Sequence, residues 1–114
     1  MAKINVPAEF LTDYANYVKT DYIKWWGKRG DENHVQKMID EFVITFEPGS
    51  SYIKVVKEGK HQRSVHSFIV NKAGKFPLGT ILKSASWKAP ATNFARGNLL
   101  DRQTWNRVTW TGVN

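Results

Sequence analysis

The chain has 114 residues and a formal net charge of +7, and this length suits one domain with a modest core. Its 41% hydrophobic content excludes an intrinsically disordered chain, and the lack of cysteine excludes a disulfide framework and a thiolate metal site. The charge is uneven, with a net of −1 over residues 1–58 and +8 over residues 59–114, where Asp101 is the only acid. This asymmetry favours a polyanion-binding half, or else a basic surface that only aids solubility.

The first predicted element is a helix that starts at Pro7 and ends before Gly27. Proline is favoured at the first helical position and glycine just after the last one. Between them, apolar residues recur every three or four positions and form one stripe, which predicts a helix of about five turns. The stripe consists of Leu11, Tyr14, Ala15, Val18, Tyr22, Trp25 and Trp26.

This first helix is unusually aromatic, which leaves two interpretations of its C-terminal end. The aromatic residues can all pack in the core, or some can anchor a protein partner, because Trp and Tyr dominate interface hot spots. Adjacent residues cannot both face the core from a helix, so one of the two neighbouring tryptophans is expected to be exposed. The candidate partner-binding residues are Trp25, Trp26, Lys28 and Arg29.

A second, shorter helix is predicted after Asp31, a favoured N-cap residue. It leads into a series of short strands that are rich in β-branched and aromatic residues. The predicted fold is therefore α+β, with two N-terminal helices packed on a small curled antiparallel β-sheet or barrel. We expect a single domain over residues 1–114, helical over 1–41 and β-rich and basic over 42–114. The predicted strands are 42–46, 52–56, 64–70, 80–83 and 105–111.

The stretch 86–101 fits neither the helical nor the strand period, and it contains Pro90, Gly97 and two asparagines. It is predicted to be a long ordered loop. Loops of this length in a small domain are often functional, but a packed Ω-loop is the alternative.

Several strings in the second half of the chain resemble one group of proteins. They are GTILKSASWKAPA at 79–91, NFARGN at 93–98, and shorter pieces at 52–55, 65–70 and 108–112. Over roughly residues 42–112 the sequence is similar to small uncharacterised proteins of tailed bacteriophages. The resemblance implies a phage origin and an intracellular role during infection, and it implies no catalytic or binding residue.

The C-terminal half alternates cations with flat aromatic rings. Lys and Arg neutralise phosphates, and rings stack on unpaired bases, so this pattern is typical of a nucleic-acid surface. Core packing of the tryptophans is the alternative, since no recognised nucleic-acid motif is present. The candidate nucleic-acid-binding residues are Lys83, Trp87, Lys88, Phe94, Arg96, Asn98, Arg102, Trp105, Arg107 and Trp110.

Catalytic chemistry has little support in the sequence. The zinc motif H-E-x-x-H is absent, and the proximity of Ser64, Ser67 and His66 in the chain is no evidence for a catalytic triad. Asp40 and Glu41 could contribute to a hard-metal site, but a solvated helix end is the ordinary interpretation. We predict no catalytic residue, no metal ligand and no cofactor.

The leading hypothesis is a non-enzymatic phage accessory protein that binds nucleic acid through its basic half. The alternative is a protein-interaction module, either a host-factor inhibitor or a virion component. It would use the basic face against an acidic host protein, or the aromatic first helix. The sequence has no signal-peptide core and no apolar run that could span a bilayer. We therefore expect a protein of the host-cell cytoplasm without membrane contact.

Overall fold

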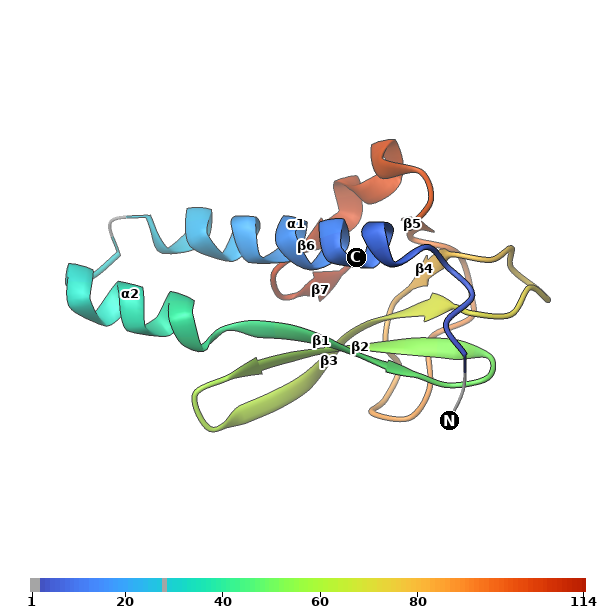
Figure 1. The fold of residues 1–114 in the computed structure, drawn as a ribbon, viewed down its shortest axis with the longest axis horizontal. Coiled ribbons are helices and arrows are strands. Elements are labelled where there is room, and N and C mark those ends of the chain that lie inside the picture. Colours follow the sequence, from blue (N-terminus) through green and yellow to red (C-terminus); the bar gives the residue numbers. More distant parts are fainter. Residues whose placement is uncertain (1–2, 28) are drawn as a thin grey trace.

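The structure is a computed structural model that describes residues 3–27 and 29–114. It is an α+β arrangement in which two helices precede a series of antiparallel strands (Figure 1). In chain order the elements are α1 (Ala8–Trp26), α2 (Glu32–Glu41), β1 (Val43–Pro48), β2 (Tyr52–Gly59), β3 (Gln62–Val70), β4 (Thr80–Leu82), β5 (Gly97–Asn98), the 3₁₀ helix η1 (Arg102–Arg107), β6 (Val108–Thr109) and β7 (Gly112–Val113).

Helix α1 forms where the apolar period predicted it. It begins one residue after Pro7 and ends at Gly27, whose φ of 43° allows the chain to leave the helix. The residues that it buries are spaced three or four apart, so they form one stripe toward the sheet. They are Leu11, Tyr14, Val18 and Tyr22.

Helix α2 is capped at its start and packs against the main core through the partly buried Ile39. The Asp31 side chain accepts a hydrogen bond from the backbone N–H of His34 at 3.3 Å, which confirms the predicted N-cap. No residue of α2 is fully buried, so it packs less deeply than α1. At its other end the chain passes through Phe42 directly into β1, as predicted.

The main sheet has five antiparallel strands in the order β1-β2-β3-β4-β5. β1 and β5 are its two edges, so the sheet is open and the barrel alternative is wrong. Closure would require the edge strands to pair, and β5 offers only two residues for pairing. Figure 1 shows α1 lying along one face of the sheet, with α2 near the C-terminal end of α1.

Side chains alternate between two faces of the sheet. Ile53, Ile69 and Ile81 face α1 and belong to the main core, and we call this side the covered face. Phe68 and Leu82 point the other way and form a second, smaller cluster on what we call the outer face. Phe68 and Leu82 are nevertheless buried, so other parts of the chain cover this part of the outer face.

The predicted strand 105–111 is wrong. Residues 102–107 form η1, and only Val108–Thr109 and Gly112–Val113 pair, as a separate two-stranded sheet. The helical turn is favoured because Asp101 accepts a hydrogen bond from the backbone N–H of Gln103 at 3.2 Å and caps it. This geometry turns Trp105 into the core.

No helix in residues 3–27 and 29–114 is long and apolar enough to cross a membrane.

Candidate nucleic-acid interface

Residues 83–96, between β4 and β5, form an ordered loop, which we call the β4–β5 loop. Ser84 and Pro90 pair across its base, and the backbone N–H of Ser86 donates to the carbonyl oxygen of Ala89 at 3.1 Å. These bonds fold the first part of the loop into a tight turn with Trp87 and Lys88 at its tip. The second part returns to the sheet, and the loop therefore presents its side chains at fixed positions.

Trp87 lies over the outer face of the sheet with 41% of its surface exposed. Lys54 of β2 places its Nζ 4.3 Å from the ring centroid, and Arg63 of β3 places its Cζ at 5.0 Å. Each such contact at an exposed site contributes about 0.5–1 kcal/mol. The two cations therefore help to hold the indole ring against the strands.

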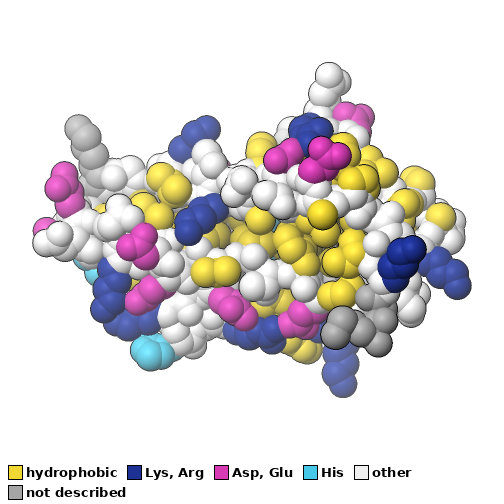
Figure 2. Space-filling model, in the orientation of Figure 1, with side chains coloured by type: hydrophobic (Ala, Val, Ile, Leu, Met, Phe, Trp, Pro, Cys, Tyr) yellow, Lys and Arg dark blue, Asp and Glu magenta, His cyan; other side chains and the backbone are white. Residues whose placement is uncertain are grey.

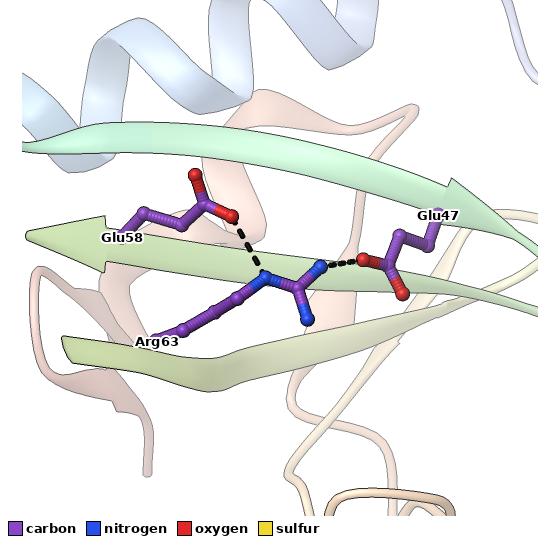
Figure 3. Close-up of polar contacts among 3 residues, drawn as sticks. All are labelled: Glu47, Glu58 and Arg63. Carbon is purple, nitrogen blue, oxygen red and sulfur yellow. Dashed lines mark hydrogen bonds and ion pairs between the residues drawn. The ribbon is translucent and has the colours of Figure 1, made fainter. Parts of the chain in front are cut away.

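Arg63 is itself held in place by two carboxylates (Figure 3). Its Nε donates to Glu58 Oε1 at 2.8 Å, and its Nη2 forms an ion pair with Glu47. All three side chains are substantially exposed, so these pairs add little to stability but do orient the guanidinium.

A shallow recess adjoins the Trp87 site on the outer face. Its volume is about 380 Å³, and its lining includes Tyr52, Lys54 and Lys88. A second recess of about 330 Å³ shares Tyr52 with it and is lined by Lys72 and Lys75. The two recesses bring four lysines together with aromatic side chains, while Glu47 is the only acid among their lining residues.

Phe94 forms a second exposed ring on the same loop, with 45% of its surface accessible. The Cζ of Arg96 lies 3.7 Å from the ring centroid, and the Cζ of Arg107 lies 5.8 Å from it. The structure therefore brings together three of the predicted nucleic-acid-binding residues. Phe94 and Arg96 are close in the sequence, and Arg107 comes from η1.

Trp105 is buried and cannot belong to an interface, which corrects its predicted role, and the partly buried Asn98 is hydrogen-bonded within the fold. Trp105 is only 3% exposed, and its Nε1 donates to the carbonyl oxygen of Asn98 at 3.1 Å. The Asn98 side chain donates to the carbonyl oxygen of Leu78 and accepts from the backbone N–H of Leu100. The hydrogen bond between Trp105 and Asn98 links η1 to β5.

Arg102 lies apart from the β4–β5 loop, against α1, where it forms an ion pair with Asp13 and its Cζ lies 4.2 Å from the Phe10 ring centroid. Lys83 is exposed at the start of the β4–β5 loop.

Trp110 joins the tryptophans of α1 in a cluster that we call the aromatic end. Its ring centroid lies 5.1 Å from those of both Trp25 and Tyr22. Trp25 is 42% exposed, with Arg29 Cζ 4.8 Å from its ring, whereas Trp26 is half-buried, as their adjacency predicted. Lys28 lies outside the described residues. Trp110 thus belongs with the predicted partner-binding set, which its sequence position did not reveal.

The histidine that sequence analysis considered for catalysis is part of a buried polar network. His66 is the extra residue of a β-bulge in β3, and its Nε2 donates to the carbonyl oxygen of Thr109 at 2.7 Å. Because Nε2 carries the proton, Nδ1 accepts from the Ser67 hydroxyl at 2.8 Å. The Ser67 oxygen in turn accepts from the Tyr14 hydroxyl at 2.9 Å.

Burial sets the protonation of this network. It lowers the pKa of His66 to about 4, with the nearby Lys57 ammonium acting in the same direction and the Thr109 hydrogen bond opposing it. Burial also raises the pKa of Tyr14. Ser67 and His66 are both buried, so no substrate reaches them, and the network supports the fold.

The charged side chains do not form one continuous basic surface on the face shown in Figure 2, because acidic side chains lie between the basic ones. Among the described residues, no three His, Asp or Glu side chains converge as a metal site. Asp40 is exposed on α2 and accepts from Gln36 Nε2 at 2.8 Å. The two aromatic rings of the β4–β5 loop are therefore the most distinctive local feature.

One protein-family model, described as "Family of unknown function (DUF7717)", matches residues 4–114. No curated protein and no solved structure matches the chain.

Proposed function

The chain belongs to the DUF7717 family of unknown function, and we propose that it binds single-stranded nucleic acid. The proposed interface consists of the β4–β5 loop and the adjoining lysine-lined recesses of the outer face. In keeping with the resemblance to phage proteins, we expect the polymer to be phage or host nucleic acid in an infected cell.

One observation carries this proposal. The β4–β5 loop exposes two aromatic rings, Trp87 and Phe94, and each ring is contacted by two cations. An exposed ring offers a surface on which an unpaired base stacks. Among the described residues, Lys54 beside Trp87 and Arg107 beside Phe94 form no ion pair with Asp or Glu, so they are the cations that can neutralise flanking phosphates. Stacking requires splayed bases, which a single strand supplies and a duplex does not.

The lysines of the two recesses extend this surface. Lys54 and Lys88 line one recess, and Lys72 and Lys75 line the other, so a backbone that crosses Tyr52 passes all four. Four phosphate contacts to a single strand predict a slope of about −3 for log Kobs against log salt concentration. The expected binding is therefore salt-dependent but retains a stacking contribution that salt does not screen.

The test is fluorescence anisotropy with labelled single-stranded and double-stranded DNA and RNA across a salt series. We expect preference for single strands, and we expect Trp87→Ala and Phe94→Ala each to weaken binding by about 5- to 100-fold, since stacking contributes about 1–3 kcal/mol per base. Trp25→Ala is the matched control, because Trp25 is equally exposed and also contacts an arginine. Unchanged affinity in both loop variants would refute the proposal.

A second candidate function is protein binding through the aromatic end, and the exposure of Trp25 favours it. Trp25 exposes 42% of its surface and contacts the Trp110 and Trp26 rings. Aromatic anchors of this kind are common at interface centres. In this test Trp25→Ala is the test variant and Trp87→Ala is the control. Trp25→Ala would abolish capture of a partner from nuclease-treated bacterial lysate, whereas Trp87→Ala would not. Equal capture by both variants would refute this candidate.

A further inference from the structure

Arg96 is a buried cation without an acidic partner. It is 7% exposed, and the ion pairs among the described residues involve only Arg63 and Arg102. Every Asp and Glu of the chain lies within those residues, so no undescribed carboxylate can serve. Because burying a charge without a counter-charge is strongly unfavourable, the environment of Arg96 favours an added anion.

The hydrogen bonds of Arg96 leave one edge of its guanidinium group free. Its Nη1 donates to the carbonyl oxygen of Phe94 at 3.2 Å. Its Nε is buried and has no acceptor, and Nη2 has none among the described residues. Nε and Nη2 form one side of the planar fork, whose geometry matches two oxygens of a phosphate or carboxylate group.

A second arginine contacts the same aromatic ring as Arg96. Arg107 contacts the Phe94 ring with its Cζ 5.8 Å from the centroid, and its Nη1 donates to the O atom of Asn114 at 3.3 Å. Two guanidinium groups contact one ring, and neither pairs with an Asp or Glu side chain among the described residues, so they attract a dianion more strongly than a single carboxylate. A phosphate group is the anion that satisfies both the charge and the fork.

We propose that the Nε–Nη2 edge of Arg96 is a binding site for a phosphate group, supplied either by a polynucleotide or by a free phosphate, and that Arg107 adds positive charge near it. The first source rests on the proposed function, and the second does not. The half-exposed Phe94 ring lies over the guanidinium and Nε is enclosed, so binding is accompanied by a movement of this ring.

The test uses inorganic pyrophosphate at constant ionic strength, with binding measured by calorimetry and by NMR of the arginine side-chain Nε–H signals. The expected result is a saturable shift of the Arg96 signal in the natural protein. Arg96→Gln and Arg96→Lys both weaken binding about tenfold or more, because a charged hydrogen-bonded fork is lost in each. Arg102→Gln is the matched control, since Arg102 also contacts a ring but already has Asp13 as its acidic partner.

Two results overturn the inference: no saturable shift of the Arg96 signal, or an equal loss in Arg102→Gln. The NMR measurement on the natural protein decides the question even if an Arg96 variant fails to fold. A parallel titration with a single-stranded oligonucleotide separates the two proposals. Pyrophosphate binding that depends on Arg96, without oligonucleotide binding, keeps the phosphate site and refutes the proposed function. Oligonucleotide binding that depends on Trp87 but not on Arg96, without pyrophosphate binding, keeps the proposed function and refutes the phosphate site.

Discussion

The buried imidazole of His66 makes the stability of this protein depend on pH in a defined window. The pKa of His66 is lowered to about 4 in the folded protein, whereas in the unfolded chain it returns to about 6.5. Between these values the unfolded state binds the extra proton and the folded state does not, so stability falls as the pH falls. The stabilising contribution of neutral His66 is complete above pH 6.5 and is lost as the pH drops toward 4.

The magnitude follows from the gap between the two pKa values. A gap of about 2.5 pKa units corresponds to about 3 kcal/mol in full, of which about 2 kcal/mol is lost between pH 7.5 and pH 5. The assay is urea unfolding of the natural protein and of His66→Gln at several pH values in that range. Carboxylates contribute equally to both proteins, so the difference between their slopes isolates His66.

We expect the natural protein to lose about 2 kcal/mol more than His66→Gln over this range. His34→Gln serves as the control for replacing an exposed histidine by glutamine. Parallel pH dependence of the natural protein and His66→Gln would show that the imidazole is not held neutral by burial, and the reasoning would fail.

Three further substitutions test the backbone and the core by urea unfolding. Gly97→Ala is expected to destabilise the protein by about 2 kcal/mol or more, because φ is 151° and an added Cβ would lie 2.6 Å from the carbonyl oxygen of Thr104; near-natural stability would contradict this. His61→Gly is expected to stabilise it by up to about 1 kcal/mol, because exposed His61 has a φ of 60° in the β2–β3 turn; a loss of stability would show that its side chain matters. Asn71→Ala is expected to cost about 2–3 kcal/mol, since its buried side chain bonds both to the N-terminal segment and to the β1–β2 turn; a cost below 1 kcal/mol would refute that role.

The local elements of the fold were predictable because their causes lie close together in the chain. The apolar stripe of α1 needs only the helical period, and the cap at Asp31 needs only its own helix. The first four strands were found from their β-branched residues. The strand predicted at 105–111 failed because Asp101 and the burial of Trp105 favour a helical turn there, and burial depends on residues far away in sequence.

The candidate interface was predictable in composition but not in arrangement. The alternation of cations and rings in the second half of the chain identified Trp87, Phe94 and Arg107, yet gave no reason to separate them from the buried Trp105. Lys54 was missed, because it lies in the half of the chain without a basic excess. Its position opposite Glu47 on β1, on the outer face, is set by the pairing of strands.

The sequence by itself determined the periodic helix, the strand-rich second half and the uneven charge, because these are properties of neighbouring residues. Only the tertiary structure decided which rings are exposed, which cations gather around them and which polar groups are enclosed. The hydrogen bond of Tyr14 with Ser67, the contact of Arg107 with the Phe94 ring and the contact of Trp110 with Trp25 all join segments that are apart in the sequence. Such contacts depend on how the sheet is covered, and no local pattern encodes that.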